Sequence, residues 1–207
     1  MARTDDSEAA LNALAQGRVV AAATESFFGF LADARSAEAL TRLLSLKPRG
    51  NEKGMPLLLP SREAFHAWVD VWPAAAEELA NVFWPGPLTL ALRARPEVDE
   101  RLLLDGRIAA RVAKPSPAAD LVVRFGGALT ATSANPPGMP PAVDSAQVAQ
   151  AFAAKVESGD LYVLAGTAPG GAPSSVVVVE GEHVHVAREG AIASARIENA
   201  LKRRLHA

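Results

Sequence analysis

Residues 108–135 read I-A-A-R-V-A-K-P-S-P-A-A-D-L-V-V-R-F-G-G-A-L-T-A-T-S-A-N, and this stretch predicts a strand, a helix and a second strand in succession. The apolar run at 108–112 is typical of a buried strand. Ser116 followed by Pro117 indicates a helix N-cap with proline at the first helical position, and the helix is expected to reach Phe125. Residues 128–132 then predict another buried strand. Alternation of this kind indicates an α/β protein.

The rest of the chain continues this alternation outward in both directions. No internal repeat or low-complexity linker interrupts it, so we expect a single domain over residues 1–207, built as a twisted mixed β-sheet with helices packed on it. The irregular stretch at 165–173 is predicted to be a functional loop. Further helices are expected at 5–15, 36–46, 65–69, 75–83 and 144–152, and further strands at 18–23, 55–59, 89–93, 176–179 and 183–187.

Composition sets limits on the function. The chain has 207 residues, 49% of them hydrophobic, and a formal net charge of -2, which argues against a surface that grips nucleic acid or an anionic membrane throughout. It contains no cysteine, so disulfides, zinc-thiolate sites and thiol nucleophiles are excluded. We see neither a secretion signal nor an apolar run long enough for a membrane span, and therefore expect a cytoplasmic protein without a membrane partner.

Several familiar catalytic motifs are missing. The sequence has neither the G-x-x-x-x-G-K-[ST] phosphate loop nor a G-x-G-x-x-G dinucleotide motif after a strand. Ser133 lacks the G-x-S-x-G surroundings of a serine hydrolase. His183 and His185 fall on one face of a predicted strand, but two histidines leave half a metal coordination shell empty. We therefore predict no protein metal site.

Cations and hydroxyl groups instead gather at the predicted ends of strands and helices. Each one alone has an ordinary explanation, as a solvated helix-end charge or a turn residue. In open α/β sheets, however, strand ends at one edge form a shared crevice where ligands bind. Such a set of donors suits a substrate that carries phosphate. The residues concerned are Thr24, Ser26, Lys47, Arg49, Lys53, Arg111, Ser133, Asn135, Ser174, Ser175 and Arg188.

The motifs around these residues resemble the YrdC-like family of L-threonylcarbamoyladenylate synthases over about residues 17–192. No one motif decides the matter, but they occur in the family's order and at plausible spacing. They are A-T-E-S-F-F-G-F at 23–30, L-K-P-R-G-N-E-K-G-M-P at 46–56, F-W-P-G-P-L-T-L at 83–90, A-A-R-V-A at 109–113, A-T-S-A-N-P-P-G at 131–138, A-P-S-S-V-V-V at 172–178 and R-E-G-A-I at 188–192.

The resemblance implies a nucleotidyltransferase that joins L-threonine, bicarbonate and ATP, with Mg²⁺ arriving on the ATP, into threonylcarbamoyl-adenylate and pyrophosphate. Partner proteins would then use the product to modify transfer RNA. By the same resemblance, Lys47 and Arg49 are the catalytic residues. The implied nucleotide-binding residues are Lys47, Arg49, Ser133, Asn135 and Arg188, and the implied threonine-binding residues are Thr24, Arg111, Ala131 and Ser174.

The chain departs from the family pattern at several positions, which indicates a divergent member. Ala23 stands where the family usually has proline, Leu31 where it has glycine, and Pro137 where it has serine. Two alternatives stay open at this point. One is a non-catalytic or divergent YrdC-like module that binds RNA directly. The other is carbamoyl-adenylate chemistry, as in larger multidomain carbamoyltransferases, whose additional domains and zinc-finger cysteines this chain lacks.

Overall fold

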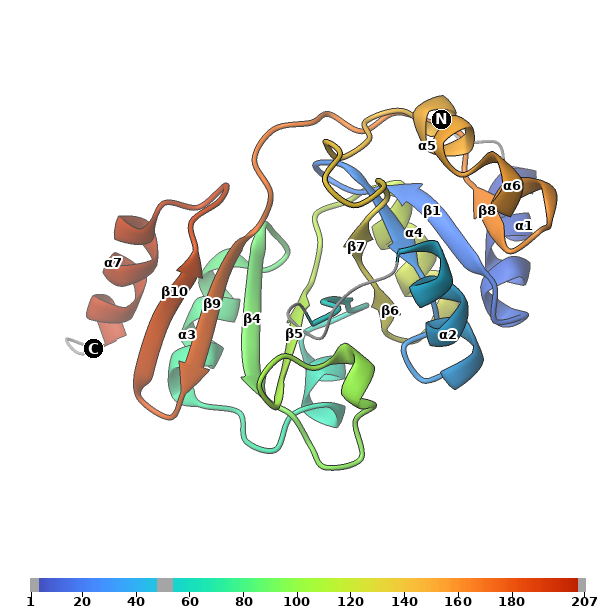
Figure 1. Cartoon of the computed structure of the whole chain (residues 1–207). Coiled ribbons are helices and arrows are strands. Elements are labelled where there is room, and N and C mark those ends of the chain that lie inside the picture. Colours follow the sequence, from blue (N-terminus) through green and yellow to red (C-terminus); the bar gives the residue numbers. More distant parts are fainter. Residues whose placement is uncertain (1–3, 48–53, 205–207) are drawn as a thin grey trace.

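The computed structural model describes residues 4–47 and 54–204. Helices and strands alternate along the chain, which confirms the predicted α/β class (Figure 1). The elements are α1 (Thr4–Ala15), β1 (Val19–Ala23), β2 (Phe28–Leu31), α2 (Ala37–Leu46), β3 (Leu57–Leu58), the 3₁₀ helix η1 (Glu63–Ala67), α3 (Ala74–Phe83), β4 (Leu88–Arg93), the 3₁₀ helix η2 (Glu100–Leu102), β5 (Arg107–Arg111), α4 (Pro117–Phe125), β6 (Leu129–Thr130), β7 (Thr132–Ser133), α5 (Ser145–Ala151), α6 (Ala153–Glu157), β8 (Leu161–Val163), β9 (Ser175–Glu180), β10 (His183–Arg188) and α7 (Ser194–Arg204).

The strands form two mixed sheets, where the sequence predicts one. A 4-stranded sheet has the order β7-β2-β1-β8, and a 6-stranded sheet has the order β10-β9-β4-β5-β3-β6. Both contain parallel and antiparallel pairs: β1 pairs antiparallel with β2 and parallel with β8, and β4 pairs antiparallel with β5 and parallel with β9. The mixed character of the sheet is therefore as expected, but its division into two is not.

The 4-stranded sheet is buried on both faces. Every residue of β1, V-V-A-A-A, is buried. Val19 and Ala21 belong to the apolar core with α2 and α5, whereas Val20 and Ala22 belong to a second core with α1 and α4. The run of small and β-branched side chains suits a strand enclosed by helices on both faces, because such strands read as continuous apolar runs.

The 6-stranded sheet is covered by helices on one face. Leu88, Leu90 and Leu92 alternate along β4 and are all 0% exposed, since they point into the core with α3 and α7. On β9, Val177 joins that core, while the neighbouring Val178 lines a cavity on the opposite face. Figure 1 shows α3 behind β9 and β10, and α7 beside β10 at the left, away from α2.

The two sheets meet within residues 129–133. Leu129–Thr130 pairs with β3 in one sheet, and Thr132–Ser133 pairs with β2 in the other. Between them, the backbone N–H of Ala131 donates to the carbonyl oxygen of Pro56 at 2.7 Å. Thr130 is fully buried, and its Oγ1 accepts from the N–H of Ala32 at 3.0 Å and donates to the oxygen of Phe30 at 3.2 Å. The strand predicted at 128–132 is thus two short strands, one in each sheet.

Other differences from the sequence prediction concern short or polar elements. The sequence did not reveal β2, β8 or α7, because F-G-F-L and L-Y-V are brief and S-A-R-I-E-N-A-L-K-R-R is a mostly polar helix. The predicted strand at 55–59 pairs only at Leu57–Leu58, and the helix predicted at 65–69 is the 3₁₀ helix Glu63–Ala67. No helix within the described ranges is long and apolar enough to span a membrane.

Candidate active site

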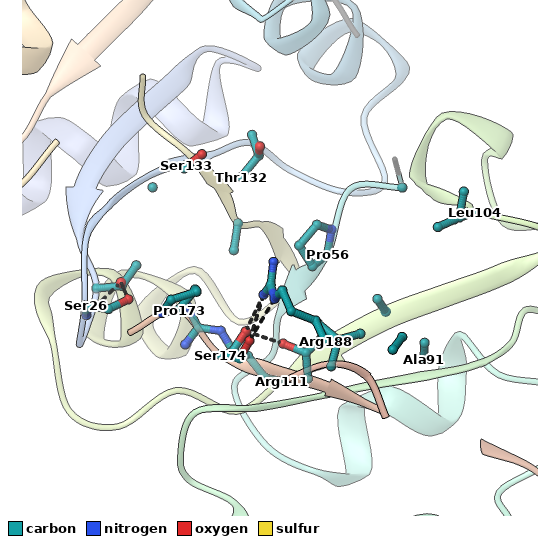
Figure 2. A pocket seen from close by; sticks show the side chains of 18 of the residues that line it. Ser26, Pro56, Ala91, Leu104, Arg111, Thr132, Ser133, Pro173, Ser174 and Arg188 are labelled. Carbon is teal, nitrogen blue, oxygen red and sulfur yellow. Dashed lines mark hydrogen bonds between the residues drawn. The ribbon is translucent and has the colours of Figure 1, made fainter. Parts of the chain in front are cut away.

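A cavity of about 630 Å³ is lined by residues of both sheets. Its size falls in the range of small-molecule sites. The lining includes the loop after β1, the β6–β7 junction and the ends of β5 and β10, so strand ends from distant parts of the sequence meet here. Figure 2 shows Arg111, Ser174 and Arg188 on one side, with Thr132 and Ser133 opposite. Among the predicted residues, Thr24, Ser26, Arg111, Ala131, Ser133, Ser174 and Arg188 line it.

Lys47 binds the wall of the cavity at Ser133. It follows the last turn of α2, and its side chain donates from Nζ to the Ser133 carbonyl oxygen at 2.6 Å, to Ser133 Oγ at 2.8 Å and to Asn135 Oδ1 at 3.0 Å. Asn135 also donates from Nδ2 to the oxygens of Pro136 and Met139. Lys47 and Asn135 are each 8% exposed. The serine and asparagine therefore anchor a lysine beside the cavity, and Asn135 also holds the loop that follows it.

Arg111 is a buried cation with a carboxylate partner. Its Nη1 pairs with Oε1 of Glu25, and the two side chains are only 10% and 12% exposed. The other carboxylate oxygen, Oε2 of Glu25, is buried and has no hydrogen-bond partner among the described residues. Thr24 shapes the loop that carries Glu25, since its Oγ1 donates to the Phe27 oxygen at 2.8 Å and accepts from the Ser26 N–H at 3.2 Å.

Arg188 is in different surroundings. Its Nη2 donates to the Ser174 oxygen at 2.8 Å and to Ser174 Oγ at 3.3 Å, and Ser174 Oγ lies 2.8 Å from Thr89 Oγ1. No acidic side chain of the described residues forms an ion pair with it. Arg188 is exposed to solvent, but partial desolvation by the surrounding protein and then the like charge of Arg111 lower its pKa below the usual value. The guanidinium stays charged at neutral pH, so an anion in the cavity would stabilise it.

A buried serine holds this part of the site in place. Ser175 is 0% exposed, and its Oγ donates to the Ile192 oxygen at 2.6 Å while accepting from the N–H groups of Gly190 and Ile192. A Cβ at Gly190 would overlap the Pro173 carbonyl oxygen, so only glycine permits the close approach of these two loops. The adjacent Ser174 and Arg188 are thereby fixed next to each other.

The remaining predicted residues lie beside the cavity or outside the described ranges. Lys47 and Asn135 contact Ser133, which lines it. Arg49 and Lys53 fall outside the described residues. Sequence reasoning missed Glu25 and Thr89. The position of Glu25 could have indicated a site residue. It lies between Thr24 and Ser26 directly after a predicted strand, and an acidic side chain between two hydroxyl groups at a strand end is typical of a polar site.

The described residues contain no group of three or more histidine, aspartate or glutamate side chains that could hold a metal ion. The donors around the cavity are guanidinium groups, an ammonium group, hydroxyls and amides. Such donors suit oxygen atoms of anionic ligands and not a bare cation.

Comparisons with known proteins give matches over most of the chain. The profile of the Sua5_yciO_yrdC family, described as telomere recombination, matches residues 12–190. The threonylcarbamoyl-AMP synthase of Idiomarina loihiensis is 40% identical over 157 residues, which cover 74% of this chain and 83% of that protein. The threonylcarbamoyl-AMP synthase of Halorhodospira halophila is 37% identical over 147 residues, which cover 70% of this chain and 76% of that protein.

A solved structure shares the fold. The crystal structure of P. abyssi Sua5 complexed with L-threonine superimposes with a TM-score of 0.85 at 27% sequence identity. The match covers 94% of this chain but 57% of the P. abyssi chain. This chain thus spans little more than half the length of that protein.

Proposed function

Because the chain belongs to the Sua5/YciO/YrdC family, we propose that it is an L-threonylcarbamoyladenylate synthase that acts on L-threonine, bicarbonate and ATP. The relatives named threonylcarbamoyl-AMP synthase support the reaction, and the threonine-bound relative supports the amino acid. The observation that carries the proposal is the cavity itself, which is lined by two guanidinium groups with carboxylate partners, those of Arg107 and Arg111, and by that of Arg188, which has no acidic partner among the described residues.

The proposed reaction needs no protein nucleophile. The neutral amine of threonine attacks bicarbonate, and water leaves to give the carbamate. A carbamate oxygen then attacks the α-phosphorus of ATP and forms a new P–O bond. The bond between the α-phosphorus and the oxygen that bridges it to the β-phosphorus breaks, and pyrophosphate leaves. The protein's share is to hold the reactants together and to stabilise the negative charge that develops on phosphate oxygens.

We assign the nucleotide to the space between Arg188 and Ser133, which lie on opposite sides of the cavity (Figure 2). Arg188 has no acidic partner among the described residues and can donate to phosphate oxygens. Lys47 sets the position of Ser133 and adds positive charge behind it. Arg49 belongs to the same assignment by its place in the K-P-R segment, and an arginine fork can clamp phosphate with two parallel bonds. Mg²⁺ would arrive as part of the ATP substrate, held mainly by its phosphates.

We assign the threonine to the side bounded by Thr24, Arg111, Ala131 and Ser174. Arg111 is held by Glu25 and lies at the end of β5, where its remaining N–H groups can bind a carboxylate. Ala131 lies at the β6–β7 junction, and Ser174 carries a hydroxyl group beside Arg188. The product would serve transfer RNA modification by partner proteins, and this role implies action in the cytoplasm.

Pyrophosphate release tests the proposal. The purified chain is incubated with magnesium-bound ATP, and threonine and bicarbonate are each omitted in turn. We expect release only when all three substrates are present, and the adenylate should be found by mass spectrometry. Release that does not depend on threonine would reject the proposed amino acid. No release under any condition, together with salt-sensitive binding of RNA, would favour the RNA-binding alternative.

A further inference from the structure

Thr89 is a buried threonine on the floor of the cavity, which is the open face of the 6-stranded sheet. It lies on β4 between Leu88 and Leu90, both 0% exposed in the core, so its side chain points to the opposite face. Thr89 is 3% exposed and lines the cavity there. Its small neighbours on this floor are apolar, so packing alone would accept a valine in its place. They are Ala91, Ala109, Val176, Val178 and Ala187.

The hydroxyl groups of Thr89 and Ser174 form a pair with one proton to spare. Thr89 Oγ1 and Ser174 Oγ lie 2.8 Å apart, and either oxygen can donate to the other. Each hydroxyl carries one proton, so only one of the two protons is used between them. Arg188 donates from Nη2 to Ser174 Oγ at 3.3 Å, which occupies a lone pair and uses no hydroxyl proton. The second proton has no acceptor in the described part of the chain, although both side chains line the cavity.

This pair lies where the two proposed binding regions meet. Ser174 bounds the proposed threonine region, and it also accepts hydrogen bonds from Arg188, which the nucleotide assignment uses. Figure 2 shows Arg111, Ser174 and Arg188 together on one side of the cavity. In the proposed product, the group that joins the threonine nitrogen to the α-phosphorus is the carboxyl group derived from bicarbonate. The meeting point of the two regions is therefore the place for that carboxyl group.

We propose that bicarbonate, and the carbamate formed from it, bind at the Thr89–Ser174 pair, with Thr89 as the positioning residue. The inference rests on the proposed function, and it adds the place of the third substrate and a residue that neither assignment above includes. Thr89 donates to Ser174, whose other lone pair accepts from Arg188, so the remaining Ser174 proton is directed into the cavity. There it meets an oxygen of the carboxyl group, while the guanidinium groups of Arg111 and Arg188 balance the negative charge.

The first test measures KM for each substrate in pyrophosphate release, with the other two saturating. Thr89→Val keeps the branched shape of the side chain and removes its hydroxyl. We expect KM for bicarbonate to rise about tenfold, the low end for a hydrogen bond to a charged group, while KM for ATP and for threonine change by less than about threefold. Thr89→Ser retains the hydroxyl and should return KM for bicarbonate to within about twofold of wild type. An unchanged KM for bicarbonate, an equal rise in all three, or no recovery with serine would overturn the inference.

Thr41→Val is the matched control, because it removes the same hydroxyl at an exposed position of α2 that does not line the cavity. It should leave all three KM values unchanged. Should Thr89→Val fail to fold, Thr89→Ser and Thr89→Ala provide the comparison, since they differ only in the hydroxyl group. A difference of about tenfold in KM for bicarbonate is then expected, and equal values would overturn the inference.

A double-variant cycle with Ser174→Ala tests whether Thr89 acts through Ser174. If it does, Thr89→Val should raise KM for bicarbonate by less than about twofold once Ser174 is alanine. A full further rise would overturn the positioning role. Wild-type protein that releases pyrophosphate without any need for bicarbonate would reject the proposed function, and the inference with it. Bicarbonate-dependent release that is indifferent to Thr89 would reject the inference alone.

Discussion

Arg111 and Arg188 line the same cavity and carry the same charge, yet their surroundings differ. Arg111 is 8% exposed and pairs with the largely buried side chain of Glu25, whereas Arg188 is exposed and donates to Ser174. Removal of Arg111 would leave a buried carboxylate without its partner. Removal of Arg188 would leave neutral groups that water can satisfy. The comparison teaches that the first arginine is tied to the stability of the fold and the second is free to serve a ligand.

The largest effect is expected for Arg111→Met. The variant leaves Glu25 buried and unpaired, so the free energy of unfolding should fall by about 3 kcal/mol, as when one member of a buried pair is removed. Denaturant unfolding measures the loss. The double variant with Glu25→Gln should recover part of it, because no charge is then left buried. A loss below about 1 kcal/mol is typical of exposed ion pairs, and it would show that Arg111 and Arg188 do not differ in their importance for stability.

Arg188→Met should show the opposite behaviour. We expect pyrophosphate release to fall roughly a hundredfold, about 2.7 kcal/mol of transition-state stabilisation. The free energy of unfolding should change by less than about 0.5 kcal/mol, because the side chain is exposed and has no acidic partner among the described residues. Steady-state rates and denaturant unfolding are measured on the same preparation. A marked loss of stability with unchanged activity would reverse the roles of the two arginines.

Arg49→Lys tests a third arginine, which is assigned to the nucleotide from the sequence alone. Arg49 lies outside the described residues, and its assignment rests on the K-P-R segment. If it clamps the triphosphate with two parallel bonds, lysine should weaken the use of ATP about tenfold, or about 1.4 kcal/mol, while folding is unchanged. The measurement is kcat/KM for ATP in pyrophosphate release. An arginine that is only a solvated charge after a helix would tolerate lysine, and near-wild-type activity would remove Arg49 from the site.

The smallest effect is expected for Glu180→Gln. Its pair with Arg107 is exposed, with side chains 58% and 29% accessible, so its removal should cost less than about 0.5 kcal/mol and even less at high salt. Thermal unfolding at low and high salt measures this. A cost similar to that of Arg111→Met would show that burial does not separate the two ion pairs.

The sequence predicts the elements whose signals are local. The cap at Ser116 and the proline at Pro117 are confirmed, as is the hairpin of β9 and β10. The division into two sheets was not predicted, because it depends on pairings of residues 129–133 with strands far away in the chain. Short strands such as β8 have too few residues for a periodic pattern. The single domain over residues 1–207 stays a prediction.

The candidate site shows the same limit. Strand-end reasoning picked out residues that line one cavity, because strand ends collect at a shared edge. It could not show that Lys47 bonds to Ser133 and Asn135, since their separation in sequence is 86 and 88 residues. The burial of Glu25 and the absence of an acidic partner for Arg188 among the described residues depend on packing in three dimensions. A sequence pattern lists charges but does not reveal which of them already neutralise each other.

The junction at residues 129–133 joins the two sheets where Ala131, Thr132 and Ser133 line the cavity. Because Leu129–Thr130 is registered on one sheet and Thr132–Ser133 on the other, a single residue, Ala131, spans the distance between them. One inserted residue would shift the alternation of side chains and turn Ser133 away from Lys47. The length of this junction therefore determines how the parts of the site on the two sheets are spaced. A change in the identity of Ala131 would keep both registers, whereas a change in the length of the link would not.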